Sequence, residues 1–206
     1  MEGQEYLNQI SAMNRPEKKA KSNGILQSKF FLVGAIGVAI FVLLAIVGAV
    51  LGSGSGGEKN RSFALKLHLD NTAEVVQEYQ ASVKSSDLRS NSASLYSVIT
   101  NTSRELTDYL TEKYDYKDSA VDKNLVEEAT LARDGLESEL FEAKINGVLD
   151  RIYAHKMAYE IALLTAEETK IINSTGNTSL KELLANSYDS LDNLYTKFDD
   201  FSETNK

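Results

Sequence analysis

The stretch "LDRIYAHKMAYEIALLTAEE", residues 149–168, decides the fold class of this 206-residue chain. No Pro or Gly interrupts it, and its apolar residues recur at the three-, four- and seven-residue spacing of an amphipathic α-helix, at Leu149, Ile152, Tyr159, Leu163 and Ala166. Beyond residue 57 the chain has no Pro, and its only Gly residues are Gly135, Gly147 and Gly176. So few breakers predict long helices, because a β-sandwich would need many more turn residues.

Working outward from this stretch, four segments show helical apolar spacing. The first covers about 61–84, and the second begins after a break, with Asp87 as a fair N-cap. The fourth opens with the capping-box pattern Ser179-x-x-Glu182. Each segment has one apolar stripe that must be buried, so the sequence predicts an antiparallel bundle of about four helices over residues 61–203.

The third segment is the longest, from Asp118 or Ser119 to about Asn173. Gly135 and the pair Asn146-Gly147 are the points where it would kink or break. The segment is therefore interpreted either as one long helix or as two.

A membrane helix is predicted over residues 30–51, where 22 residues carry no charge. As a helix these residues span about 33 Å, enough to cross a hydrocarbon core of about 30 Å. Five basic residues precede this run, at Arg15, Lys18, Lys19, Lys21 and Lys29, and this cluster is denser than the one that follows. The positive-inside rule then places residues 1–29 in the cytoplasm and the C-terminal domain outside it.

The stretch "AIVGAVLGSGSGGEK", residues 45–59, leaves two alternatives. A cleavable signal peptide has an apolar core of about 7 to 15 residues and then an A-x-A-like site, and this chain matches neither feature well. The sequence favours an uncleaved anchor, with residues 52–60 as a flexible Gly/Ser linker.

The charge distribution limits the partners. Residues 1–29 hold five basic and three acidic residues, which leaves seventeen basic and twenty-seven acidic residues in the rest of the chain. A domain this acidic does not suit nucleic acid, whereas the basic arm suits anionic lipids of the inner leaflet. The expected partners are the lipid bilayer and a protein outside the cytoplasm, and the oligomeric state is left open.

No catalytic constellation is found, so the protein is not expected to be an enzyme. The chain has no Cys, and neither of its two His residues has a Glu three positions earlier, as di-iron bundles require. The only metal-ligand candidates are weak ones, His155 and Glu160, and a solvated helix face is the favoured interpretation of them. No cofactor is expected.

Two stretches carry a family resemblance. Residues 146–198, "NGVLDRIYAHKMAYEIALLTAEETKIINSTGNTSLKELLANSYDSLDNLYTKF", resemble the last two helices of a ferritin-like family of exported bacterial proteins of unknown function, and residues 83–110, "VKSSDLRSNSASLYSVITNTSRELTDYL", resemble its earlier helix junction. Asp150, Arg151 and Tyr153 match the family's Asp-Arg-x-Tyr motif. Where the family tends to have histidines, this chain has Glu160 and, in the second helix, Asn101 or Thr102. The resemblance implies a helical bundle in the cell envelope and puts inherited metal binding in doubt.

Together these features predict a single-pass, membrane-anchored helical bundle outside the cytoplasm, acting as a binding or envelope-interaction module. The alternative hypothesis is a ferritin-like metal-binding or stress protein that uses His155 and nearby carboxylates.

Overall fold

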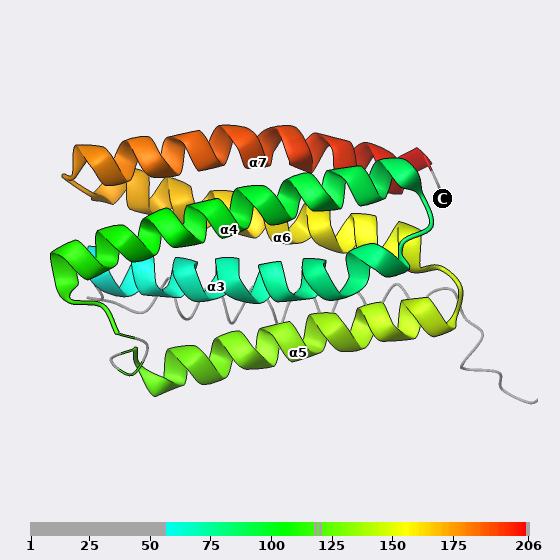
Figure 1. Cartoon of the computed structure of the whole chain (residues 1–206), viewed down its shortest axis with the longest axis horizontal. Coiled ribbons are helices and arrows are strands. Elements are labelled where there is room, and N and C mark those ends of the chain that lie inside the picture. The colour runs from blue at the N-terminus through cyan, green and yellow to red at the C-terminus, as the bar shows by residue number, and fades with distance from the viewer. Residues whose placement is uncertain (1–56, 118, 120, 205–206) are drawn as a thin grey trace, which may run out of the picture. The chain divides into compact units, whose positions relative to one another are not determined.

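The computed structural model describes residues 57–117, 119 and 121–204, and within these residues the chain forms helices and no strand. The helices are α3 (Glu58–Tyr79), α4 (Ser86–Tyr114), α5 (Lys123–Ile145), α6 (Leu149–Ser174) and α7 (Thr178–Thr204), with a short 3-10 turn η2 (Gln80–Ser82) after α3 (Figure 1). The predicted all-α class is confirmed for the described part of the chain.

Successive helices run in opposite directions (Figure 1). α3, α4, α7 and α6 pack as a ring in which each helix contacts the next, and α5 lies outside the ring against α3 and α6. The described part is thus an antiparallel bundle of five helices, one more than the predicted number of about four. The additional helix comes from the third predicted segment.

That segment breaks at Asn146-Gly147 and continues through Gly135. Gly147 has a φ of 72°, and the N–H groups of Gly147 and Val148 donate to the carbonyls of Lys144 and Ala143 at 3.2 and 2.9 Å. This is a Schellman motif, in which a left-handed residue ends a helix and satisfies its last carbonyls. Gly135 lies inside α5 with helical geometry, because a lone Gly weakens a helix without terminating it.

Two helices start at residues other than the predicted caps. At α4 the side chain of Ser85, and not that of Asp87, accepts from the N–H of Leu88 at 3.4 Å. At α7 the side chain of Asn177, and not that of Ser179, accepts from the N–H of Leu180 at 2.9 Å. In both cases the cap stands one position before the helix, where an N-cap side chain reaches the exposed N–H groups of the first turn.

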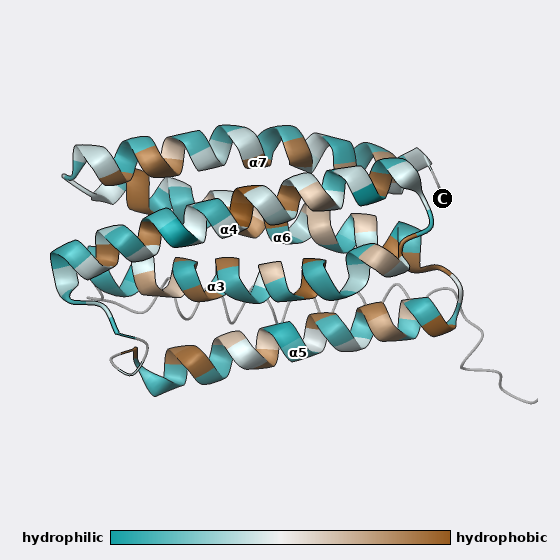
Figure 2. Ribbon diagram, viewed as in Figure 1, coloured by the Kyte–Doolittle hydropathy of each residue, from teal (hydrophilic) through white to brown (hydrophobic). Residues whose placement is uncertain are grey.

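The core lies between the inward faces of the helices, and along each helix apolar positions alternate with polar ones (Figure 2). Tyr153 of α6 and Phe198 of α7 are among the largest fully buried side chains. Their rings pack edge to face, with the ring centroids 6.3 Å apart. The outer face of α5 is an exception, since Leu131, Phe141 and Ile145 are 61%, 57% and 69% exposed.

The predicted arm (1–29), membrane helix (30–51) and most of the linker (52–60) lie outside the described residues. Among the described residues, no helix has the length and apolar character needed to cross a bilayer. α3 begins at Glu58, so the bundle starts slightly earlier than the predicted residue 61.

Candidate functional site

The two predicted metal-ligand candidates do not come together. His155 is exposed on α6, whereas Glu160 of the same helix is buried and faces α3. There the Oε2 atom of Glu160 lies 2.8 Å from Nε2 of His68, a residue that the sequence analysis did not select. The Nδ1 atom of His68 lies 3.1 Å from Oε1 of Glu167.

His68, Glu160 and Glu167 form a charged group in the bundle interior, which we call the His68 cluster. The His68 side chain is 18% exposed, and the two Glu side chains are 8% exposed. Burial alone would lower the pKa of His68, but the carboxylates of Glu167 and Glu160 outweigh it and raise this pKa to about 10. At neutral pH the imidazole is therefore protonated, and each ring N–H donates to a different carboxylate.

This geometry suits an ion pair between helices better than a metal site. In the arrangement observed, Glu160 and Glu167 lie against different ring nitrogens of His68, which point in different directions, so the two carboxylates do not face one common metal position. Within the described residues, no group of three or more His, Cys, Asp or Glu side chains is arranged to hold a metal ion. The His68 cluster links α3 to α6.

Glu168, the residue after Glu167, is a buried acid of a different kind. Its side chain is fully buried, and neither carboxyl oxygen has a hydrogen-bond partner. Burial raises its pKa to about 8, and the nearby Ser187 hydroxyl opposes this shift only in part. Glu168 is therefore largely uncharged at neutral pH, which removes most of the cost of burying it.

A second carboxylate cluster lies at the end of the bundle where α3 begins. Glu58, in the first turn of α3, accepts hydrogen bonds from Tyr109, Lys113 and Tyr114 at the end of α4 and from Thr175 after α6. Burial would raise the pKa of Glu58, but these four donors, led by Lys113, lower it to about 2. We call this group the Glu58 cluster. It joins the start of α3 to the ends of two other helices.

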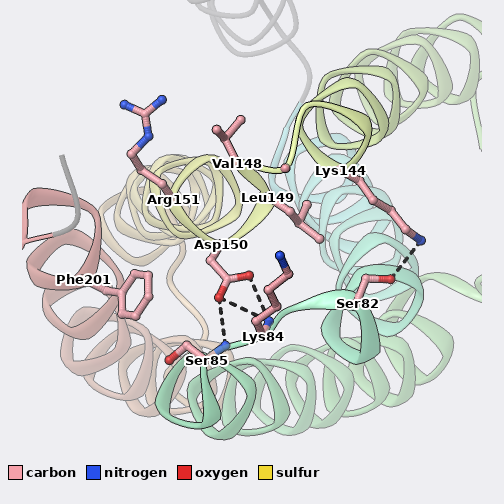
Figure 3. Close-up of a pocket in the computed structure, with 10 residues that line it drawn as sticks. Ser82, Lys84, Ser85, Lys144, Val148, Leu149, Asp150, Arg151 and Phe201 are labelled. Atoms are coloured by element: carbon pink, nitrogen blue, oxygen red, sulfur yellow. Dashed lines mark hydrogen bonds between the residues drawn. The ribbon is translucent and has the colours of Figure 1, made fainter.

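The opposite end of the bundle holds a pocket of about 670 Å³, shown in Figure 3. Its lining comes from η2, from the junction between η2 and α4, from the end of α5, from the start of α6, and from Phe201 of α7. The carboxylate of Asp150 accepts from the backbone N–H groups of Lys84 and Ser85, at 2.9 and 2.8 Å. These bonds fix the start of α4 against the start of α6.

The residues of the Asp-Arg-x-Tyr motif thus occupy two environments. Asp150 and Arg151 line the pocket, whereas Tyr153 lies in the core against Phe198. Asn101 is exposed on α4, and Thr102 is buried and donates to the Ser187 hydroxyl at 2.9 Å. Neither of these two residues belongs to the His68 cluster.

The ten residues that line the pocket include three cations, Lys84, Lys144 and Arg151, and one carboxylate, Asp150. Among the described residues, no acidic side chain forms an ion pair with any of these cations, and the Lys144 ammonium donates only to the Ser82 hydroxyl, at 3.0 Å. The pocket therefore carries a net charge of +2 in a chain whose net charge is −8.

Comparison of the chain with family models, curated proteins and solved structures finds no match. The ferritin-like resemblance therefore stays a prediction.

Proposed function

We propose that this chain is a single-pass membrane protein whose helical bundle lies outside the cytoplasm and acts as a binding module. The membrane part of the proposal rests on the apolar run 30–51, the basic residues before it and the Gly/Ser stretch after it. The all-helical bundle that begins at Glu58 agrees with a soluble domain that follows a linker.

The pocket is the observation that carries the binding role. Its volume of about 670 Å³ lies in the usual range of ligand sites, and it combines apolar and charged lining residues. It is also far from the end where the chain enters the bundle: Glu58 contacts the end of α4, whereas the pocket lies at the start of α4. A tether at Glu58 would therefore join the bundle at the end opposite the pocket.

A binding role also fits the chemistry of His68 better than a catalytic role. Both ring nitrogens of His68 are occupied by carboxylates, and the chain has no Cys that could serve as a nucleophile. The proposal therefore assigns no catalytic residue.

Cysteine labelling of the full chain in intact cells tests the topology, because the natural chain contains no Cys. Ser190→Cys introduces a thiol at an exposed position of α7, and Ser22→Cys introduces one in the basic arm. A membrane-impermeant maleimide should label Ser190→Cys on intact cells and Ser22→Cys only after permeabilisation. The reverse pattern would overturn the orientation, and a soluble product that begins near Ser53 or Ser55 would overturn the permanent anchor.

The alternative function, a ferritin-like metal-binding or stress protein, draws on the carboxylates that α6 places in the bundle interior. Glu160, Glu167 and Glu168 are all buried there, and the first two contact His68. A metal ion would have to displace the proton that holds His68 between its two partners. Metal analysis of the purified full chain tests this function, since stoichiometric iron, zinc or manganese would favour it over the binding module.

A further inference from the structure

The charge of the pocket points to the class of its ligand. Lys84 stands before α4, Lys144 is in the last turn of α5, and Arg151 is in the first turn of α6, so three separate elements bring cations to one pocket. Other lysines for which the described residues provide no acidic partner, such as Lys170, Lys181 and Lys197, lie exposed along α6 and α7 and do not line this pocket. A concave site with an excess of one charge attracts ligands of the opposite charge.

The one carboxylate in the pocket does not cancel this preference. Asp150 accepts from the backbone N–H groups of Lys84 and Ser85, so its negative charge is directed toward the start of α4. At the start of α6 the N-cap residue, Val148, provides no side-chain cap for the N–H groups of the first turn, and Asp150 in the same turn offsets part of their positive field.

Apolar side chains line the pocket, and others are exposed near it along the chain. Leu149, Val148 and Phe201 contribute to the lining, and Val148 is 39% exposed. Next to it along the chain, Ile145 and Phe141 expose 69% and 57% of their surface at the end of α5. A small inorganic anion would leave this surface in water, whereas an apolar chain attached to the anion would cover part of it.

We propose that the pocket binds an anionic group, a phosphate or a carboxylate, that is carried on an apolar chain. In Figure 3 the ammonium of Lys84 lies between the other two cations, whereas the charged ends of Lys144 and Arg151 point to opposite sides. Lys84 binds the anion, Lys144 and Arg151 turn toward it from their exposed positions, and Val148, Phe201 and the end of α5 contact the apolar chain. This inference rests on the proposed binding function and names the ligand class of the same site. An amphiphilic anion of this kind is available as a lipid or as a soluble acyl or alkyl anion.

Calorimetric titration of the full chain in phosphatidylcholine nanodiscs tests the ligand class, with empty nanodiscs titrated as the blank. The probes are hexyl phosphate, inorganic phosphate and 1-hexanol. Hexyl phosphate should bind at least tenfold more tightly than either of the other two, because it alone combines the anion with the apolar chain. Equal affinity for inorganic phosphate, or equal affinity for hexanol, would overturn the proposal.

A pair of matched triple variants assigns the binding to the pocket. Lys84→Gln/Lys144→Gln/Arg151→Gln should weaken hexyl phosphate binding at least tenfold. The control Lys170→Gln/Lys181→Gln/Lys197→Gln removes the same charge from positions outside the pocket and should stay within twofold of the natural chain. Equal loss in both variants, or no loss in the first, would contradict the assignment, and circular dichroism verifies that both remain helical.

Vesicle binding distinguishes the two sources of the ligand. Nanodiscs that carry the full chain are mixed with vesicles of phosphatidylglycerol or of phosphatidylcholine, and co-flotation is measured. Binding to phosphatidylglycerol vesicles that the pocket variant loses identifies the ligand as a membrane lipid, whereas tight binding of hexyl phosphate without vesicle binding identifies a soluble anion. Failure of the maleimide labelling would overturn the membrane topology and leave these titrations valid, so the two proposals fail separately.

Discussion

The charged side chains at the two ends of the bundle differ in whether they have partners of opposite charge. At the end where α3 begins, one carboxylate, that of Glu58, receives hydrogen bonds from four side chains, including the cation Lys113. At the pocket end, Lys84, Lys144 and Arg151 line the cavity and no acidic side chain of the described residues pairs with them. The first arrangement satisfies its charges internally and so serves stability, whereas the second leaves its charges available to a ligand.

This contrast predicts where a lost charge reduces stability. Removing one member of a hydrogen-bonded charge cluster leaves its partners unpaired, and the resulting loss in the free energy of unfolding increases with burial. Removing a cation for which the described residues provide no acidic partner should leave the free energy of unfolding nearly unchanged. The His68 cluster lies between the two ends, and losing its cation should produce the largest decrease in the free energy of unfolding.

His68→Ala should produce the largest loss. It leaves the carboxylates of Glu160 and Glu167, each 8% exposed, without their shared cation, and we expect the free energy of unfolding to fall by about 3 to 5 kcal/mol. Urea unfolding of the full chain, followed by circular dichroism, measures this loss. The control is His155→Ala, the other histidine, which is exposed and should change stability by about 0.5 kcal/mol or less.

The same cluster predicts a loss of stability at alkaline pH. The pKa of His68 is raised to about 10 from an ordinary value of 6.5, so its stabilisation is complete below pH 6.5 and is lost as the pH rises through 10. The natural chain should therefore lose more stability than His68→Ala between pH 7 and pH 10. If the free energy of unfolding fell equally with pH in the two proteins, His68 would not be held as a cation.

Glu58→Gln tests the contribution of the Glu58 cluster to stability directly. The substitution removes the charge that four donors share, and we expect a loss of about 2 kcal/mol in the free energy of unfolding. Glu105→Gln is the control, because Glu105 is an exposed partner of Arg104 at 3.9 Å and should contribute about 0.5 kcal/mol or less. An equally small loss for both variants would remove the contrast between the two ends.

The pH dependence of this loss has the opposite sign to that of His68. The folded-state pKa of Glu58 is lowered to about 2 from 4.5, so its stabilisation is present above pH 4.5 and is lost as the pH falls through 2. The free energies of unfolding of the natural chain and of Glu58→Gln, measured as a function of pH, should therefore converge at acidic pH. A constant difference between pH 7 and pH 2 would contradict the role assigned to the carboxylate.

The sequence predicted the architecture well because the architecture depends on local patterns. The breaker-free run 149–168 lies within α6, and the pair Asn146-Gly147 includes the break that the structure shows. The predicted apolar stripe of this run was only partly right, since Leu149 and Leu163 are buried, whereas Ile152 and Tyr159 are half-buried and Ala166 is exposed. The buried face of α6 includes Tyr153, Met157 and Ile161 instead. The number of helices could not be fixed, because Gly135 and Asn146-Gly147 are equally plausible breaks in the sequence. Only Gly147 has the positive φ and the carbonyl partners of a helix end.

The His68 cluster was missed because it is a tertiary contact. His68 lies 92 residues before Glu160, and no sequence spacing connects the two. Helix geometry alone would have argued against the predicted pair, since at 3.6 residues per turn His155 and Glu160 are about 140° apart around α6, whereas Glu160 and Glu167 are only about 20° apart. The pocket was likewise beyond sequence reasoning, because its cations come from three separate elements.

Substitution of two glycines tests the helix break at the pocket end, with a smaller expected change in the free energy of unfolding. Gly147 has a φ of 72°, and a Cβ atom there would meet nothing within 4 Å, so Gly147→Ala should lose about 1 kcal/mol through backbone strain alone. Gly135→Ala is the matched control, because the site is equally open but helical, and we expect a gain of about 0.5 to 1 kcal/mol. The same sign for both variants in urea unfolding would contradict the helix break at residue 147.

The smallest expected effect decides whether the contrast between the ends is real. Lys84→Gln, Lys144→Gln and Arg151→Gln should each change the free energy of unfolding by about 0.5 kcal/mol or less, because none of the three substitutions leaves a carboxylate unpaired. Lys113→Gln, which removes a partner of Glu58, should be the more destabilising change even though the Lys113 side chain is 37% exposed. Urea unfolding of the four single variants in one buffer measures this difference. If the pocket cations prove as important for stability as Lys113, they serve the fold, and a ligand is no longer needed to explain why they gather in one pocket.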